Sequence, residues 1–269
     1  MPPTDLRPDL PAAFLATPIA HRALHGPGRP ENSAAAIAAA VEAGYGIEID
    51  LQGSVDGVAI VFHDETLDRL TTESGPVRAR SADALSAIAL AGGDGAGIPT
   101  LAEVLALVAG QVPLLIEIKD QTKTPGGFDE ALERATAEAL AGYAGPVAVM
   151  SFNPRSMAAM ARLAPDVPRG LTTYAFPLSD FPAAQDDPAA EARLRALAEI
   201  AAFDEVGASF ISHHHRDLDR ARVAELKARG VPVLCWTTRT PEEEAAARRI
   251  ADNVTFEHYP AAVPATARA

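Results

Sequence analysis

The chain has 269 residues, 48% hydrophobic and 22% charged, which is enough to bury one sizeable core, so a single domain over 1–269 is expected, with its motifs between about 17 and 260. The net charge of −13 excludes a broad basic surface of the kind that binds nucleic acid or anionic lipid. The single cysteine, Cys235, excludes an internal disulfide, and no stretch approaches the roughly 18 apolar residues of a membrane span.

The first segment, residues 1–20, carries charged residues and prolines where a signal peptide would have an uninterrupted apolar run. A cytoplasmic protein is therefore expected.

From there the chain alternates short apolar runs, rich in β-branched residues, with longer segments of helical periodicity, which is typical of βαβ units. Eight strands are expected, at 17–20, 46–51, 58–62, 113–118, 147–151, 170–173, 209–212 and 231–236. Helices are expected at 34–43, 101–109, 155–163, 217–229 and 242–250, and an exposed loop at 180–190. This pattern predicts an α/β fold, a closed (β/α)8 barrel of the TIM type, although an open doubly wound sheet would show the same alternation.

The connection between the second and third strands is irregular, because residues 52–57 are too few for a crossover helix. A two-residue turn at Asp56-Gly57 would place Asp50 opposite His63 on one face of the pair. A longer extended crossover is the alternative, and it would also bring both residues to one rim of the barrel.

Carboxylates alternate with apolar residues in two of the expected strands. Glu48 and Asp50 share one face of the second strand, and Glu117 shares a face with Lys119 in the fourth. A solvent-facing strand would explain the first pair, and a structural ion pair the second. Together, however, three inward carboxylates would be costly unless they bound a cation, and an all-oxygen set favours Mg²⁺ or Ca²⁺ over zinc.

Two histidines end expected strands. His21 closes the first and His63 the third, so in a barrel both would stand at the carboxyl-terminal rim, where active sites are built. A lone histidine at a strand end is usually structural, but two beside carboxylates can accept and donate protons in one turnover. Arg22 could hold a phosphate by two parallel hydrogen bonds, and Arg22 or Lys119 would offset the excess charge of three carboxylates over a divalent cation.

In chain order, these residues resemble the signature of the glycerophosphodiester phosphodiesterase family, over nearly the whole chain. The matching runs are His21-Arg22, Pro30-Glu31-Asn32, Ile47-Glu48-Ile49-Asp50, Asp56-Gly57, Val61-Phe62-His63-Asp64, Leu67-Asp68-Arg69, Thr71, Ile116-Glu117-Ile118-Lys119, Ser151-Phe152 and Trp236-Thr237. The resemblance implies a barrel that hydrolyses a glycerophosphodiester to glycerol phosphate and an alcohol.

The resemblance also implies roles for individual residues. These are metal ligation by Glu48, Asp50 and Glu117, acid–base catalysis by His21 and His63, phosphate contacts from Arg22 and Lys119, support of the site by Glu31, and a pocket wall from Trp236. Phosphoinositide-specific phospholipases C share this kind of site, which implies attack by the substrate's own hydroxyl through a cyclic phosphate. Which histidine is the acid and which the base is left open.

The sequence departs from the family pattern in two places. Ala23 stands where the family usually has glycine, and a longer segment, residues 24–29, follows it before Pro30. Near the C-terminus, Glu257 stands where the family usually has aspartate, and no role is assigned to it.

Two other functions fit part of the pattern. One is a barrel enzyme that stabilises an enolate at its metal, with Lys119 as the base. The other is a binding module that retains the pocket without the chemistry. For the phosphodiesterase, the expected partner is a small-molecule glycerophosphodiester, with no nucleic acid and no stable membrane association; the oligomeric state is open.

The run His213-His214-His215 invites a transition-metal interpretation, yet it lacks partner ligands at a known spacing. A loop after the seventh strand is expected there, with His213 at most touching substrate. His25, in the longer segment, could replace His21 in part.

Overall fold

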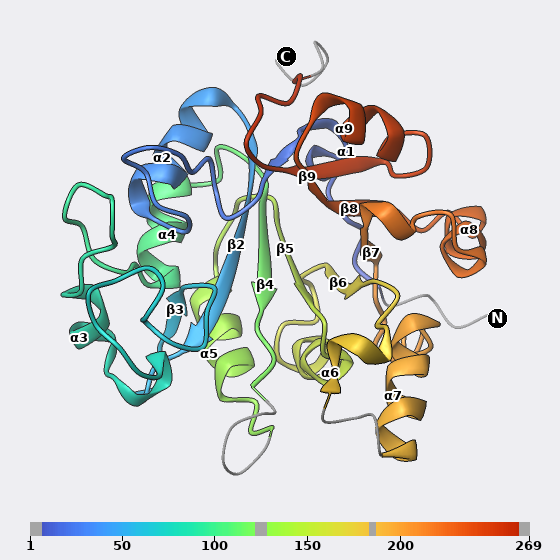
Figure 1. The fold of residues 1–269 in the computed structure, drawn as a ribbon, viewed down its shortest axis with the longest axis horizontal. Coiled ribbons are helices and arrows are strands. Elements are labelled where there is room, and N and C mark those ends of the chain that lie inside the picture. The colour runs from blue at the N-terminus through green and yellow to red at the C-terminus, as the bar shows by residue number, and fades with distance from the viewer. Residues whose placement is uncertain (1–6, 122–127, 183–186, 264–269) are drawn as a thin grey trace.

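Eight parallel strands close into a barrel in the computed structural model, which describes residues 7–121, 128–182 and 187–263 (Figure 1). The barrel strands are β1 (Ile19–Ala20), β2 (Gly46–Gly53), β4 (Leu114–Ile118), β5 (Val147–Ser151), β6 (Arg169–Thr173), β7 (Phe210–His214), β8 (Val233–Thr238) and β9 (Asn253–Phe256). Neighbours pair in the order β1-β9-β8-β7-β6-β5-β4-β2, and the pairing of β1 with β2 closes the ring. The predicted (β/α)8 barrel is therefore confirmed.

The membership of the barrel differs from the prediction at one strand. The expected third strand, 58–62, is β3 (Ala59–Val61), which lies outside the barrel and pairs antiparallel with the far end of β2. The eighth barrel strand is instead β9, which the sequence pattern did not reveal. Its buried Asn253 and Thr255 alternate with only two apolar residues, so the strand lacks the apolar run by which the others are recognised.

The short connection from β2 to β3 is an antiparallel turn, so the turn, and not the longer crossover, is the correct alternative. Its predicted register, however, is wrong by one residue. The backbone N–H of Phe62 donates to the carbonyl oxygen of Asp50 at 2.9 Å, so Phe62 lies opposite Asp50 and His63 does not. The reason is a wider turn. Ser54 pairs with Val58, donating from its backbone and accepting at its hydroxyl, and this leaves three residues in the loop.

Helices connect the strands and surround the barrel (Figure 1). They are α1 (Ala13–Ala16), α2 (Ala34–Ala43), α3 (Ala82–Ser86), α4 (Leu101–Val108), α5 (Ala131–Leu140), α6 (Pro154–Leu163), α7 (Pro188–Ala198), α8 (Ala221–Ala228) and α9 (Pro241–Ala247), with 3-10 turns at Val77–Ala79, Leu178–Asp180 and His215–Asp217. No helix in the described ranges is both long and apolar enough to cross a bilayer.

The expected helix boundaries hold where capping residues mark them. Ser33 accepts a hydrogen bond from the third residue of its helix, and Thr100 forms a reciprocal capping box with Glu103. The helix expected at 217–229 begins later, at the start of α8, because residues 215–217 form a separate 3-10 turn. The expected loop at 180–190 ends where Asp187 caps α7, and its part at 183–186 lies outside the described residues.

Alternate strand residues face two separate apolar layers, as the period of a strand requires. Ile47, Ile49 and their counterparts on other strands pack outward against the helices. Inside the barrel, Leu115 and Phe210 pack with Phe14 of α1. A Cβ added at Gly170 would lie 2.3 Å from the Phe210 ring, so this glycine makes room for the ring inside the barrel.

The segment from 54 to 99, between β2 and α4, forms an excursion with its own small core; it includes β3 and α3, at the left of Figure 1. This core contains Ile60, Phe62, Leu67, Val77, Ala82, Leu85, Ile88, Leu90 and Ile98, and it is separate from the two barrel layers. The excursion therefore packs as a satellite unit beside β2.

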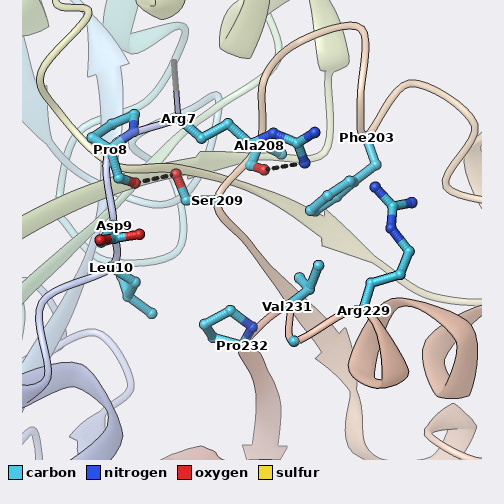
Figure 2. A pocket seen from close by; sticks show the side chains of 11 residues that line it. Arg7, Pro8, Asp9, Leu10, Phe203, Ala208, Ser209, Arg229, Val231 and Pro232 are labelled. Atoms are coloured by element: carbon cyan, nitrogen blue, oxygen red, sulfur yellow. Dashed lines mark hydrogen bonds between the residues drawn. The ribbon is translucent and has the colours of Figure 1, made fainter. Parts of the chain in front are cut away.

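A cavity of about 460 Å³ lies at the amino-terminal end of the barrel strands, where the N-terminal segment crosses the starts of β7 and β8 (Figure 2). The guanidinium groups of Arg7 and Arg229 both lie over the ring of Phe203, 5.3 and 5.7 Å from its centroid, and both bind Asp204. The Ser209 hydroxyl donates to the carbonyl oxygen of Pro8. These contacts hold the N-terminal segment against the barrel. Residues at the amino-terminal face of such barrels usually contribute to stability.

Candidate active site

A cavity of about 200 Å³ opens at the carboxyl ends of the barrel strands. It is smaller than the cavity in Figure 2, but it gathers ionisable side chains from several strands, as active sites of barrel proteins do. The predicted site residues that line it are His21, Arg22, Glu48, Asp50, His63, Glu117, Lys119 and Trp236. Glu31 lies behind them and accepts a hydrogen bond from Arg22. The structure therefore brings the whole predicted set together.

Three carboxylates form the floor of this site. Glu48 and Asp50 project from β2 and Glu117 from the neighbouring β4, where Asp50 and Glu117 are paired in register. One oxygen from each lies within 4.8 Å of the others, and all three residues are buried. Burial and the charges of Asp50 and Glu117 raise the pKa of Glu48 well above its usual value. An all-oxygen cluster whose carboxylates repel one another in this way could hold a hard divalent cation.

Two cationic side chains lie against the acidic cluster. Lys119 Nζ donates to Asp50 Oδ1 at 2.7 Å and to Glu117 Oε1 at 2.6 Å. The backbone N–H of Arg22 donates to Glu48 at 2.8 Å, and its Nε lies 3.6 Å from Asp50. Burial alone would lower the pKa of Lys119, but its carboxylate partners raise it above the usual value. Lys119 therefore keeps its positive charge.

His21 follows β1 and is oriented by a carboxylate. Its Nδ1 lies 2.7 Å from Oε2 of Glu257, which follows the adjacent strand β9, and its backbone N–H donates to the carbonyl oxygen of Phe256. Burial lowers the pKa of His21, and the Glu257 carboxylate offsets only part of that effect. A neutral imidazole that donates its Nδ1 proton to Glu257 leaves Nε2 as a proton acceptor.

Glu257 is the main site residue that sequence reasoning missed. Its other oxygen lies 2.7 Å from Nε of Arg239, and Nε2 of His25 lies 3.5 Å from the oxygen that binds His21. Burial would raise the pKa of Glu257, but the bond from His21 and its other cationic neighbours hold it well below the usual value. Recognising β9 would have placed Glu257 at the same rim as His21. His25 contacts Glu257 and does not line the cavity.

His63 reaches the rim by a different route from the expected one. The chain leaves the barrel along β2 and returns along the antiparallel β3, so His63 comes back to the carboxyl ends of the barrel strands from outside. Its Nδ1 lies 2.7 Å from Oδ1 of Asp64. The hydrogen bond from Arg69 is the main cause that lowers the pKa of Asp64 to about 2. Asp64 and Arg69 were visible in the sequence only as parts of the family motif.

Aromatic side chains form another part of the cavity wall. The rings of Phe152, after β5, and Trp236, in β8, meet edge to face with centroids 5.4 Å apart, and both line the cavity. Tyr174 contacts both rings, at 6.0 and 6.3 Å. An apolar wall beside charged groups suits a substrate with one charged and one less polar end.

The run His213-His214-His215 lies outside the cavity. His213 and His214 end β7 and do not form the expected loop, and only His215 lies in the 3-10 turn that follows. His213 is buried, with Nδ1 2.7 Å from the Thr173 hydroxyl and Nε2 3.0 Å from the carbonyl oxygen of Asp217. It does not line the cavity. Among the residues that the structure describes, only the cluster of Glu48, Asp50 and Glu117 has the spacing of a metal site.

The loop after β1 carries the first departure from the family pattern. Ala23 adopts φ +64°, a left-handed conformation that favours glycine, and its N–H donates to the carbonyl oxygen of Glu48 at 2.9 Å. Arg22 and Asn32 also have positive φ, of 51° and 58°. The backbone is therefore held in unusual conformations where it presents His21 and Arg22 to the cavity.

Comparisons with known proteins point to one family. Residues 21–256 match the model of the Glycerophosphoryl diester phosphodiesterase family. A glycerophosphodiester phosphodiesterase of Caldanaerobacter subterraneus subsp. tengcongensis is 36% identical over 160 residues, 57% of this chain and 65% of that protein. The matched region thus spans slightly less than two thirds of that relative.

Solved structures of phosphodiesterases share the fold of this chain. A phosphodiesterase of Oleispira antarctica, in complex with the product sn-glycerol-3-phosphate, is 26% identical, with a TM-score of 0.71 over 92% of this chain and 96% of that one. A glycerophosphodiester phosphodiesterase of Thermotoga maritima shares the fold, with a TM-score of 0.66 and 21% identity over 89% and 94% of the two chains. Since the family model extends from His21 to the end of β9, this chain belongs to the glycerophosphoryl diester phosphodiesterase family.

Proposed function

We propose that this protein is a phosphoric diester hydrolase that converts glycerophosphodiesters to glycerol phosphate and an alcohol, using a divalent cation and two histidines. One observation carries the proposal: a buried trio of carboxylates shares its cavity with two imidazoles, His21 and His63, each bound at Nδ1 by a further carboxylate. Family membership, and the product-bound relative from Oleispira antarctica, support a substrate with a glycerol phosphate part.

Glu48, Asp50 and Glu117 would hold the cation, Mg²⁺ or Ca²⁺, because hard cations prefer carboxylate oxygens. A bound ion supplies positive charge that polarises a phosphoryl oxygen and lowers the pKa of a coordinated hydroxyl. Three carboxylates exceed a divalent ion by one negative charge. Lys119, which already binds Asp50 and Glu117, offsets this excess and leaves the site able to accept an anionic substrate.

Arg22 and Lys119 bind the phosphate in this proposal. The Arg22 guanidinium is held from behind by Glu31, whose Oε1 accepts from Nη1 at 2.8 Å. A guanidinium fixed in this way can direct its other N–H groups toward two phosphate oxygens, with less loss of side-chain entropy on binding.

His21 is the base of the first step and His63 the acid. Because burial lowers the pKa of His21, its Nε2 is free to accept the proton of the glycerol 2-hydroxyl as that oxygen attacks phosphorus. The bond from phosphorus to the leaving oxygen breaks, and His63 protonates that oxygen, which releases the alcohol and leaves a cyclic phosphate. Water then opens the ring, with His63 accepting a proton from water and His21 returning its proton to the 2-oxygen.

The aromatic wall of Phe152 and Trp236 would contact the leaving alcohol. With a net charge of −13, the protein is expected to take small diesters from solution in preference to anionic bilayers. A reducing cytoplasm suits the single cysteine, Cys235, which is buried.

The two alternative functions are less well supported. An enolate-forming enzyme would need Lys119 as a base, but the raised pKa of Lys119 keeps it protonated. A binding module without chemistry would have no use for two imidazoles that are each oriented by a carboxylate.

Release of glycerol phosphate from a panel of glycerophosphodiesters, with choline, ethanolamine, inositol and glycerol as the alcohols, tests the proposal. We expect turnover with Mg²⁺ or Ca²⁺, none in chelator, and losses of orders of magnitude in folded His21→Ala and His63→Ala. A transient cyclic phosphate in phosphorus NMR spectra would support the two-step route. The proposal fails if the folded protein cleaves no diester with any divalent cation.

A further inference from the structure

Arg69 lies outside the cavity yet connects the supports of two residues inside it. It belongs to the excursion beside β2, and its side chain is 47% exposed. Within the described part of the chain, its side-chain hydrogen bonds go to two carboxylates. Nη1 and Nη2 bind the two oxygens of Glu31 at 2.9 and 2.7 Å, and Nε and Nη2 bind the two oxygens of Asp64 at 2.6 and 2.9 Å.

One of these carboxylates holds the proposed phosphate ligand. Oε1 of Glu31, which accepts from Arg69 Nη2, also accepts from Nη1 of Arg22 at 2.8 Å. Glu31 is thus shared between two guanidinium groups, one inside the cavity and one outside. Although burial would raise the pKa of Glu31, the bond from Arg69 and the charge of Arg22 lower it, so Glu31 stays ionised.

The other carboxylate holds the proposed acid. Oδ1 of Asp64 accepts from Arg69 Nη2 and lies 2.7 Å from Nδ1 of His63. A single nitrogen of Arg69 therefore binds both oxygens that orient residues of the site, one toward Arg22 and one toward His63. Isolated surface ion pairs contribute little, but a fork that binds two carboxylates through two oxygens each fixes their positions.

We propose that Arg69 is a positioning residue that sets the phosphate-binding Arg22, through Glu31, and the proton-transferring His63, through Asp64. This inference rests on the proposed function. Without Arg69, two carboxylates now joined by one guanidinium would repel each other and turn toward solvent. Arg22 and His63 would then lose the partners that fix their orientation, and misplacement by about 1 Å can cost on the order of 100-fold in rate.

Arg69 acts through two arms, one by way of Glu31 to Arg22 and one by way of Asp64 to His63. The two arms affect different kinetic constants. Glu31→Gln weakens the hold on Arg22, so it should raise KM and weaken binding of sn-glycerol-3-phosphate, with a smaller effect on kcat. Asp64→Asn removes the negative charge behind His63 and lets an amide N–H donate to its Nδ1, so it should lower kcat and leave the affinity for the product nearly unchanged. Arg69→Met should do both, with about a 10-fold change in each constant.

A second variant and a matched control separate positioning from simple destabilisation. Arg69→Lys keeps the charge, but its single ammonium nitrogen cannot bind all four carboxylate oxygens as the guanidinium fork does, so it should recover only part of the two effects. Arg80 lies in the same excursion and pairs with Glu73 at 2.6 Å, away from the cavity. Arg80→Met should leave kcat, KM and product affinity as in the wild type. In Arg69→Met/Glu31→Gln, product binding should be no weaker than in Arg69→Met alone.

The outcomes are distinct. If the wild type cleaves diesters and Arg69→Met keeps its kcat, KM and product affinity, the inference is wrong and the proposed function stands. The inference also fails if Arg69→Met only lowers the melting temperature. It fails too if the loss of product affinity in Arg69→Met/Glu31→Gln equals the sum of the losses in the two single variants. If the wild type cleaves no diester, the proposed function fails first, and calorimetric titration with sn-glycerol-3-phosphate still tests the Glu31 arm.

Discussion

Glu257 and His21 are 236 positions apart in the chain, yet Oε2 of the first lies 2.7 Å from Nδ1 of the second. The neighbours His63 and Asp64 repeat this contact at the same distance. Both imidazoles of the site are therefore fixed at Nδ1 by an ionised carboxylate, and both have Nε2 left for proton transfer. The two contacts come from unrelated parts of the fold, one from the closing strand β9 and one from the excursion.

The first prediction concerns Glu257. In Glu257→Gln, the amide can donate to Nδ1 of His21 and so stabilise the imidazole with its proton on Nε2, where it cannot act as a base. We expect kcat to fall by roughly 10²- to 10⁴-fold while the protein stays folded, by analogy with other oriented histidines. Steady-state kinetics and circular dichroism measure this. Glu257→Asp, which keeps the charge, should lose less, and a Gln variant as active as the wild type would refute the assigned role.

The pH profile gives a second test, and its sign follows from the pKa of His21. Burial holds this pKa below the usual value, so the neutral base persists to more acidic pH, and kcat/KM should fall only below about pH 6.5. Removing the negative charge of Glu257 disfavours the imidazolium further. In Glu257→Gln the acidic limb should therefore move to lower pH. A shift to higher pH would show that the limb does not report His21.

Metal binding can be measured without turnover. The acidic cluster repels itself, so Glu48→Gln should leave the metal-free protein as stable as the wild type or more so. In the wild type, Mg²⁺ or Ca²⁺ at about 100 times its Kd should stabilise the fold by about 2.7 kcal/mol, and Glu48→Gln should lose most of this gain. Glu42→Gln, an exposed change of equal charge on α2, should keep it. An equal thermal shift in both variants would place the cation elsewhere.

The strained loop after β1 predicts a stabilising substitution. Ala23 has φ +64°, which costs an L-residue about 1 kcal/mol more than glycine, so Ala23→Gly should raise the free energy of unfolding by roughly that amount. The same change at Ala38, an exposed residue inside α2, should lower it by about 1 kcal/mol. Urea denaturation compares the two variants. Destabilisation by Ala23→Gly would mean that the methyl group matters more than the backbone conformation.

The acidic cluster could be predicted from the sequence because strand geometry leaves little choice. Side chains at i and i+2 share a face, so Glu48 and Asp50 had to point the same way once β2 was recognised. The parallel pairing of β4 with β2 then set Glu117 beside them. The predicted barrel and family are confirmed for the same reason, since both depend on apolar runs and motifs that are local in the chain.

What could not be predicted depends on contacts between distant segments. The polar residues of β9 hid the closing strand, and with it the place of Glu257 beside His21. The one-residue error in the β2–β3 register came from Ser54, whose hydroxyl closes a wider turn than Asp56-Gly57 alone would form. Neither signal is periodic, so a pattern of apolar residues does not contain it.

Because the excursion has its own small core, the two histidines of the proposed proton transfer lie in units that differ in the free energy of local unfolding. His21 is anchored to the barrel, whereas His63 depends on a cluster of few apolar side chains beside it. Warming should loosen this smaller unit first, because regions with little buried apolar surface open locally at a lower free energy. Catalysis would then fade while the barrel is still intact, and return on cooling without any need to refold the whole chain.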